Sequence, residues 1–192
     1  EDDYRRLTGA HNPIWSLDLR DLGFTPGSRG KNPFGHFGES ENYFVVIDDE
    51  SAYCHKRDAL YTFQHFVLCE MGARDPKNSA SGQTLDDYEY FRLWKYCREN
   101  NLVPDHTPIP LKGVVGYALK HDFCEPEDLE QFSDDADENN EGEDADDTPD
   151  EKAGKRNLKL PDDVYFPVLK DIEDTTGYTP ARLNDSGRSE EG

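Results

Sequence analysis

Apolar residues gather in two short stretches in the first third of the chain, and a polar turn separates them. The stretches are NYFVVI (42–47) and SAYC (51–54), with the acidic turn DDE between them. Both are rich in aromatic and β-branched residues. The pattern predicts two short strands joined as a hairpin with a longer loop.

A helical period of apolar residues follows directly. In ALYTFQHFVLCEM (59–71), Leu60, Phe63 and Val67 fall on one face, and Asp58 precedes the run as a candidate N-cap. The pattern predicts a helix from residue 59 to residue 71 that packs on the hairpin.

Two further helical patterns cover residues 85–100 and 109–121, after a stretch at 75–83 that we interpret as a linker. Thr84 is the predicted cap of the first helix, and Pro110 lies near the start of the second. Two glycines weaken the second helix unless another element packs closely against it. These glycines are Gly113 and Gly116.

A last helical pattern lies within 159–180, where Val164, Val168 and Ile172 follow helical spacing. Because proline breaks an interior turn, we expect the regular part of this helix to start at Phe166 or Pro167. One hairpin followed by several helices predicts the α+β fold class.

The formal charge of −21 is unevenly distributed. Residues 125–151 hold 15 acidic residues and no lysine or arginine, whereas 21 basic and 27 acidic residues elsewhere give −6. A run so poor in apolar groups cannot offset the entropy of ordering, so we expect an acidic disordered linker. The predicted units are an N-terminal segment (1–26), a hairpin with a helix (27–73), a helical pair (84–123), the linker (124–158), a short C-terminal helix (159–180) and a tail (181–192).

Composition also suggests a host and a compartment. Acidic residues exceed basic ones even outside the run. This balance favours a protein from a host in concentrated salt, such as a haloarchaeon, over an ordinary acidic cytosolic protein.

The four cysteines are widely spaced with no leader peptide before them, so we expect reduced thiols and a cytoplasmic location. The longest apolar run, FVVI, is too short for a membrane span. The chain begins EDDY without methionine, and we interpret it as a piece of a longer polypeptide.

Two short turn sequences flank the hairpin. They are NPFGH (32–36) and YCHKRDA (53–59). Their order and spacing resemble the N-terminal zinc ribbon of bacterial and phage replicative primases, in which Cys-Pro-Phe-His, a strand pair and Tyr-x-Cys-x-x-Cys precede Asp-Ala and a helix. The resemblance covers about residues 27–70. It implies a zinc-ribbon-like hairpin module from a primase-helicase-like replication protein, as in haloarchaea or archaeal viruses.

The resemblance places Asn32, His36, Cys54 and Arg57 at the four metal-ligand positions. Arginine keeps a fixed positive charge and cannot bind a cation, so we expect a degenerate metal site and no cofactor. Arg57 either brings its charge near the vacated centre, donating to Asn32 or to turn carbonyls, or points into solvent. A rearranged zinc site is the alternative, and its candidate ligands are His36, Cys54, His55, His121 and Cys124.

Basic residues lie in or beside both turn sequences, close to aromatic residues such as Tyr43 and Tyr53. Basic groups attract phosphates and aromatic rings stack on bases, a combination typical of single-stranded nucleic-acid binding. The alternative is an aromatic core with scattered surface charges. The predicted nucleic-acid-binding residues are Arg29, Lys31, His36, Lys56 and Arg57.

These patterns predict a non-catalytic module that binds single-stranded or primer-template DNA, or that positions other domains of the parent protein, with no membrane partner. The rival is a protein-interaction module whose acidic linker binds a basic partner or masks a DNA site. The parent protein is a candidate primase or helicase, but this chain has no phosphate-binding Gly-Lys-Ser/Thr loop. Its aspartate pairs, such as Asp48-Asp49, fall at turns and helix starts where carboxylates have structural roles. We therefore expect no catalytic residue.

Overall fold

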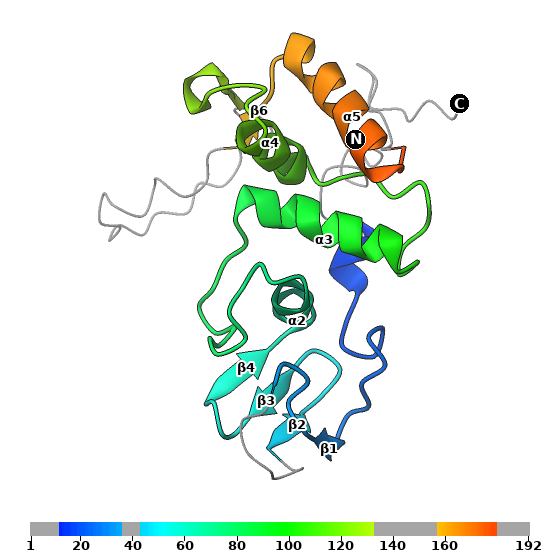
Figure 1. Ribbon diagram of the computed structural model, residues 1–192, viewed down its shortest axis with the longest axis vertical. Coiled ribbons are helices and arrows are strands. Elements are labelled where there is room, and N and C mark those ends of the chain that lie inside the picture. The colour runs from blue at the N-terminus through cyan, green and yellow to red at the C-terminus, as the bar shows by residue number, and fades with distance from the viewer. Residues whose placement is uncertain (1–11, 36–42, 133–156, 180–192) are drawn as a thin grey trace, which may run out of the picture.

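An antiparallel sheet lies at one end of the molecule and a group of helices at the other, with one helix, α2, between them (Figure 1). The computed structural model describes residues 12–35, 43–132 and 157–179. This arrangement confirms the α+β class. In chain order the elements are η1 (Pro13–Ser16), β1 (Arg29–Gly30), β2 (Phe44–Val46), β3 (Ala52–Cys54), β4 (Ala59–Tyr61), α2 (Phe63–Glu70), α3 (Asp87–Glu99), α4 (Leu111–Lys120), η2 (Pro126–Asp128), β5 (Glu130–Phe132), β6 (Asn157–Lys159) and α5 (Asp162–Thr176).

The four strands of the sheet follow the order β1-β2-β3-β4, each antiparallel to its neighbour. Strands β2 and β3 form the predicted hairpin, with Phe44 opposite Cys54 and Val46 opposite Ala52. The sequence pattern predicts neither β1 nor β4, which are two and three residues long. Strands this short carry too few residues to reveal an alternating period.

Helix α2 begins at Phe63, so the prediction of a helix from residue 59 was wrong at its start. Residues 59–61 form β4, whose backbone pairs with β3. Asp58 does not cap the helix, because its backbone adopts the left-handed region (φ 53°) between the two strands. Thr62 caps it instead, and the Thr62 hydroxyl accepts a hydrogen bond from the His65 amide (3.4 Å).

Helix α2 contributes to two hydrophobic clusters. Its Phe66 packs with the sheet, which confirms the predicted contact with the hairpin, whereas Phe63 and Val67 belong to the helical cluster. The segment before β1 also reaches both clusters, since Ile14 is buried among the helices and Leu19 under the sheet. The sheet cluster consists of Leu19, Phe44, Val46, Ala52, Cys54, Ala59, Tyr61 and Phe66.

The stretch 75–83 is tied to the sheet and to α2, which differs from the plain linker that we predicted. The Ala80 amide donates to the Leu60 carbonyl (2.7 Å), and the Leu60 amide donates to the Ser79 hydroxyl (3.0 Å). The Asn78 carbonyl lies 2.8 Å from Nε2 of His65. These bonds cover the outer edge of β4, which would otherwise present unpaired backbone groups.

Helices α3 and α4 approach each other closely at two glycines. A Cβ on Gly116 would lie 2.2 Å from the carbonyl carbon of Asp87, and a Cβ on Gly113 would lie 2.8 Å from the Phe91 amide nitrogen. The close packing that these glycines require is therefore present. Helix α4 itself lies within the predicted range 109–121.

Helix α5 starts at Asp162 and contains Pro167, so the prediction that its regular part starts at Phe166 or Pro167 was wrong. Because Pro167 has no amide hydrogen, the helix lacks the hydrogen bond to the Asp163 carbonyl. Asp163 is exposed and lies in the first turn. Apolar burial holds the rest of the helix on the helical group. The buried residues are Val168, Leu169 and Ile172.

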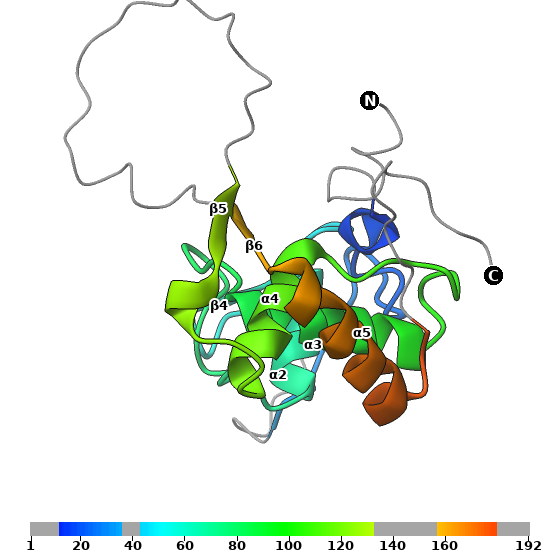
Figure 2. The ribbon, with the colours of Figure 1, turned by 90° about the horizontal axis from the view of Figure 1, so that it is seen from above.

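One short strand lies inside the stretch 124–158, which is predicted to be a disordered linker, and a second begins at its C-terminal end. Strands β5 and β6 pair antiparallel beside α4, with Glu130 opposite Lys159 (Figure 2). The predicted linker is thus structured at both of its ends. Residues 133–156, which hold most of its acidic groups, lie outside the described residues.

Candidate nucleic-acid interface

The first turn beside the hairpin (residues 32–35) is shaped by the side chain of Asn32. Its amide oxygen accepts a hydrogen bond from the Phe34 amide (2.9 Å), and its backbone carbonyl accepts one from Gly35 (3.3 Å). Its amide nitrogen donates to the Tyr61 hydroxyl (3.2 Å). An asparagine that accepts from the amide two residues ahead forms an Asx turn. The residue at the first ligand position therefore holds the turn with its own hydrogen bonds.

The second turn (residues 54–57) buries Cys54 and exposes Lys56. The Arg57 amide donates to the Cys54 carbonyl (3.1 Å) and closes the turn. Asp58 then reverses the chain into β4, and its carboxylate accepts a hydrogen bond from the Tyr53 hydroxyl. This bond raises the pKa of the Tyr53 phenol.

Asn32, one of the ligand positions suggested by the resemblance, contacts the Tyr61 hydroxyl, which accepts from Asn32 and donates to the Pro76 carbonyl (2.5 Å). Burial raises the pKa of Tyr61 and the neighbouring Cys54 adds to the rise, while the Asn32 bond and the Arg57 charge oppose it. Arg57 is half-buried and its Nε is enclosed. A side-chain hydrogen bond therefore joins Asn32 to Tyr61, and Cys54 belongs to the same sheet cluster as Tyr61.

A metal ion finds no ligand set in the part of the chain that the structure describes. No group of three or more histidine, cysteine, aspartate or glutamate side chains there could hold one. His121, proposed for a rearranged site, stacks on Tyr117 of α4 (4.1 Å between ring centroids), whereas Cys54 belongs to the sheet cluster. His36 lies outside the described residues, so its predicted place in this site stays untested.

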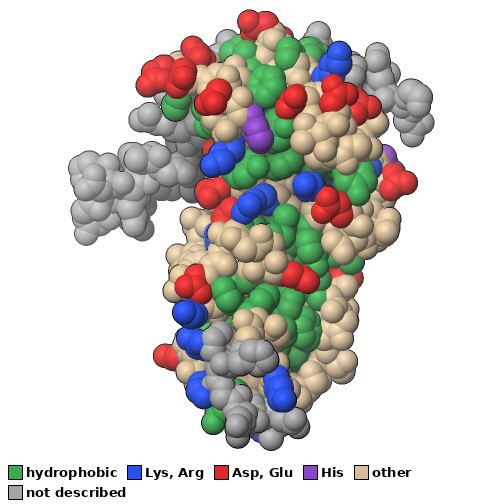
Figure 3. Space-filling view, viewed as in Figure 1, with side chains coloured by type: hydrophobic (Ala, Val, Ile, Leu, Met, Phe, Trp, Pro, Cys, Tyr) green, Lys and Arg blue, Asp and Glu red, His purple; other side chains and the backbone are tan. Residues whose placement is uncertain are grey.

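Exposed basic side chains surround the two turns, and Figure 3 shows Lys and Arg gathered at this end of the molecule. Arg29 comes from β1, Lys31 precedes the first turn and Lys56 lies in the second, and all three are exposed. The Nζ of Lys56 lies 5.5 Å from the centroid of the Tyr43 ring. We call Arg29, Lys31, Lys56 and Arg57 the basic end. His36, the fifth predicted binding residue, lies outside the described residues.

Aromatic and aliphatic side chains lie beside the basic end on the outer face of the sheet, which is turned away from α2. The strand register places Arg29, Val45, Tyr53 and Leu60 in one row across the sheet. Tyr43 and His55 continue this face toward the basic end, since the His55 amide donates to the Tyr43 carbonyl (2.9 Å). Tyr43 is 38% exposed, and the Tyr53 and His55 rings meet edge to face at 5.0 Å. We call Val45, Tyr53, Leu60, Tyr43 and His55 the outer face.

Sequence reasoning missed Leu60 and His55 as members of this surface. Leu60 was assigned to a helix, although the order Ala59, Leu60, Tyr61 buries its first and last residues and turns the middle one outward, as in a strand. His55 was weighed only as a metal ligand. Because Ala59, Leu60 and Tyr61 are all apolar, the sequence of β4 contains no alternation that could have found Leu60.

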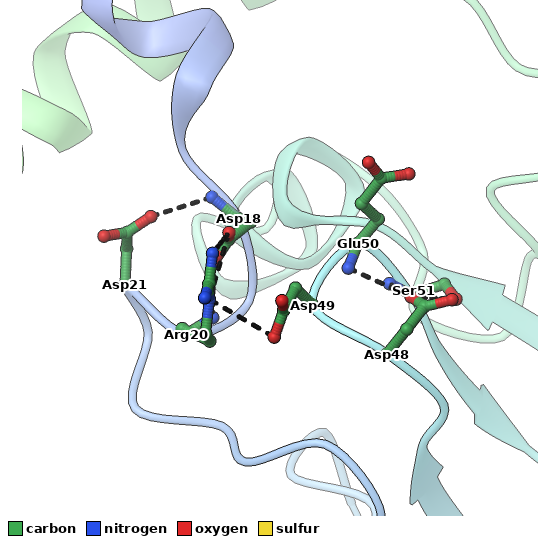
Figure 4. Close-up of polar contacts among 7 residues, drawn as sticks. All are labelled: Asp18, Arg20, Asp21, Asp48, Asp49, Glu50 and Ser51. Carbon is green, nitrogen blue, oxygen red and sulfur yellow. Dashed lines mark hydrogen bonds and ion pairs between the residues drawn. The ribbon is translucent and has the colours of Figure 1, made fainter.

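The opposite end of the hairpin is acidic, and its carboxylates support the turn (Figure 4). Asp48 accepts hydrogen bonds from two turn amides (3.0 and 2.8 Å) and from the Ser51 hydroxyl (2.8 Å). The Ser51 bonds hold the pKa of Asp48 below its usual value. Arg20 lies 3.2 Å from Asp49 and 2.7 Å from Asp18, which ties the segment before β1 to the hairpin. Asp48 and Asp49 thus have the structural surroundings that the sequence indicated.

Helix α2 contains a cysteine and a histidine in contact, a pair that the sequence analysis did not single out. The Cys69 Sγ lies 3.5 Å from His65 Nε2. Burial raises the pKa of the Cys69 thiol to about 11 and lowers the pKa of His65. Since both groups are then neutral at neutral pH, the pair lacks the thiolate that a nucleophilic cysteine requires.

Comparison with family models, with curated proteins and with solved structures gives no significant match to this chain. The resemblance to a primase zinc ribbon therefore stays a prediction that rests on the order and spacing of residues in the two turns. Among the described helices, none combines the length and apolar character that crossing a membrane requires.

Proposed function

We propose that this chain is a non-catalytic nucleic-acid-binding module and that its ligand is single-stranded DNA. The observation that carries the proposal is the meeting of the basic end with the outer face. Lys56 lies against the exposed Tyr43 ring, and Tyr53, whose ring meets that of His55, shares a row across the sheet with Arg29. Phosphates are attracted to positively charged side chains, and unpaired bases stack on aromatic rings.

The charge distribution of the hairpin also supports this site. Its two ends carry opposite charge, with arginine and lysine at one end and Asp48, Asp49 and Glu50 at the other. A polyanion is attracted to the first end and repelled from the second. The strand is therefore expected to lie across the basic end and to place its bases on the outer face.

The resemblance to a primase ribbon suggests the setting of this function. In a replication protein, the module would hold single-stranded or primer-template DNA near a polymerase or helicase domain of the same parent chain. The four cysteines are free thiols, which fits the reducing interior of a cell. This part of the proposal depends on the resemblance, whereas the interface depends on the geometry.

Binding to labelled oligothymidine, followed by fluorescence anisotropy between about 50 and about 200 mM salt, tests the basic end. The variant Lys31→Ala/Lys56→Ala removes two exposed charges and leaves the half-buried Arg57 in place. Each lost phosphate contact lowers the slope of log K against log salt by about 0.7, so we expect a decrease of about 1.4. The matched control, Lys95→Ala/Lys120→Ala on α3 and α4, should bind like the wild type. Equal weakening in both variants would contradict a localised interface.

The outer face is tested by Tyr53→Ala and Tyr53→Phe in the same assay. Stacking of one base on an aromatic ring contributes about 1–3 kcal/mol, so the alanine variant should bind about 5- to 150-fold more weakly. Phenylalanine keeps the ring and loses only the hydroxyl contact with Asp58. Equal affinity of both Tyr53 variants and the wild type would remove the outer face from the proposal.

A further inference from the structure

An arginine at the end of the helical group is buried without an acceptor for its charge. Arg98, in the last turn of α3, is only 7% exposed. Its Nε and Nη1 are enclosed and have no hydrogen-bond partner within the described part of the chain. No carboxylate among the described residues forms an ion pair with it.

Two aromatic rings enclose this guanidinium. Its Cζ lies 5.6 Å from the centroid of the Trp94 ring and 4.9 Å from that of Tyr178. The two rings are nearly perpendicular (87°). Trp94 is fully buried, whereas Tyr178, which follows α5, is partly exposed and forms the outer wall. Figure 1 shows the C-terminal ends of α3 and α5 side by side at this place.

A second polar group near Trp94 is also unsatisfied. The Trp94 indole donates to the Thr107 carbonyl (2.9 Å), which fixes the inner wall. The Thr107 hydroxyl is buried and has no hydrogen-bond partner among the described residues. Buried polar groups are almost always hydrogen-bonded, so an unpartnered group of this kind points to a polar ligand.

Arg74, a largely buried arginine among the described residues, shows what Arg98 lacks. Arg74 pairs with Glu89 through both carboxylate oxygens (2.6 Å each) and also donates to Gln83 and to the Thr84 carbonyl. Within the described ranges, the contacts of the Arg98 guanidinium are the faces of its two rings. Cation–π contacts compensate a small part of the cost of burying an unpaired ion.

We propose that Arg98, Trp94 and Tyr178 form a binding site for a small oxyanion, a carboxylate or phosphate group. Both groups present two oxygens that match a guanidinium fork. A bidentate oxyanion bonds Nη2 together with either Nε or Nη1, so each edge of the fork offers one of the two unpartnered nitrogens. Tyr178 covers the bound group from outside. This site is separate from the basic end and does not depend on the proposed function.

The test titrates the whole chain with sodium phosphate and, separately, with sodium acetate at constant ionic strength. The readouts are the Nε–H signal of Arg98 in a nitrogen-15 correlation spectrum and the midpoint of thermal unfolding. We expect a saturating shift of that signal and a rise in Tm with at least one anion. At a concentration 100 times Kd, the folding equilibrium shifts by about a hundredfold toward the folded state.

Variants separate this site from general salt effects. Arg98→Met removes the charge, so its Tm should not respond to either anion and should equal or exceed that of the wild type without anion. Arg92→Met is the matched control, because Arg92 lies on the same helix over the Tyr88 ring (5.6 Å). It should keep the full response.

Each outcome bears on the proposal. A response to phosphate alone assigns a phosphate ligand, and a response to acetate alone assigns a carboxylate. The Nε–H signal is read in the wild type, so the test holds even if Arg98→Met folds poorly. Absence of a saturating shift with both anions would overturn the site, as would equal anion dependence of Tm in wild type and Arg98→Met.

Discussion

Arg74 and Glu89 form a buried ion pair between the loop after α2 and the start of α3. Glu89 accepts both bonds from Arg74 and a third from the Asp86 amide (3.0 Å), as part of the capping box of α3. Burial raises the pKa of Glu89, but the bonds from Arg74 and Asp86 outweigh it and hold the pKa below the ordinary value. The ionised carboxylate therefore stabilises the folded state.

Glu89→Gln should destabilise the protein in a way that depends on pH. At neutral pH the variant leaves Arg74 buried without its counter-ion, at an expected cost of about 3 kcal/mol. Because the pKa of Glu89 is lowered in the folded state, its carboxylate stabilises that state fully above pH 4.5, the pKa in the unfolded chain. This contribution is lost as the pH falls through the pKa of the folded state. The difference in free energy of unfolding between variant and wild type, from urea titrations, should therefore shrink below pH 4.5.

An exposed pair provides the control for this measurement. Lys95 and Glu99 lie 3.6 Å apart on the surface of α3. Such pairs contribute at most about 0.5 kcal/mol, so Glu99→Gln should have little effect at any pH. A Glu89→Gln effect that stays constant through acid pH would contradict the role given to the Glu89 charge.

At the scale of elements, α3 and α4 are held together at a distance that only glycine permits. The site of Gly116 faces the backbone of Asp87, and that of Gly113 faces the backbone of Phe91. Backbone, unlike the end of a flexible side chain, cannot yield without moving the whole helix. The helix pair is therefore expected to respond sharply to a single added methyl group.

Gly116→Ala should destabilise the protein, although alanine favours an isolated helix by about 1 kcal/mol over glycine. The added Cβ would lie 2.2 Å from the Asp87 carbonyl carbon, so the helices must separate. We expect a net loss of about 1–3 kcal/mol in the free energy of unfolding, measured by denaturant titration. Gly30→Ala is the control, because nothing lies within 4 Å of a Cβ there. A stabilised Gly116→Ala variant would show that α3 and α4 do not pack as described.

The sequence predicted the elements better than their ends, because several positions offered more than one plausible cap. Asp58 and Thr62 both suit an N-cap, and pairing of residues 59–61 with β3 decided for Thr62. Thr84 and Asp86 presented the same choice, and the capping box with Glu89 decided for Asp86. The strand pairing that decided the first boundary is not contained in the local pattern, whereas the capping box that decided the second is a local signature that the prediction did not use.

The sequence predicted only part of the candidate site, because some of its residues are positioned by contacts with distant parts of the chain. The two turns and their basic residues follow from local sequence, and the structure joins Asn32 to Tyr61, which shares the sheet cluster with Cys54. The role of Tyr61 as the partner of Asn32 was hidden, because the sequence pattern predicts its segment as part of a helix. The burial of Arg98 could not be foreseen, since it depends on Tyr178, which is distant in sequence.

At the scale of the whole molecule, charge is separated between the basic end of the sheet and the acidic remainder. Figure 3 shows many acidic side chains over the helical end. Residues 133–156 add eleven acidic and three basic residues to the composition. They are inserted between β5 and β6, whose pairing brings Phe132 opposite Asn157. A replacement of this insertion can therefore keep both strands.

Replacing residues 133–156 by Asn-Gly tests how this acidic insertion acts on DNA binding. A two-residue turn fits paired strands, so β5 and β6 should remain. If the insertion repels or masks DNA, the shortened chain should bind oligothymidine more tightly at low salt. The gain should fade as added salt screens the charges. Fluorescence anisotropy over a salt series measures both effects.

The same replacement, combined with Lys31→Ala/Lys56→Ala, separates the two functions that the sequence suggested. If the basic end binds DNA, the combined variant loses the affinity gained by shortening, because the attractive charges are gone whatever the insertion does. If the insertion instead recruits a basic protein partner, shortening leaves oligothymidine binding unchanged, and the two lysines have no influence on it. If the affinity gained by shortening persists after both lysines are replaced, the DNA site lies away from the sheet. The two lysines are the part of the basic end that the combined variant changes.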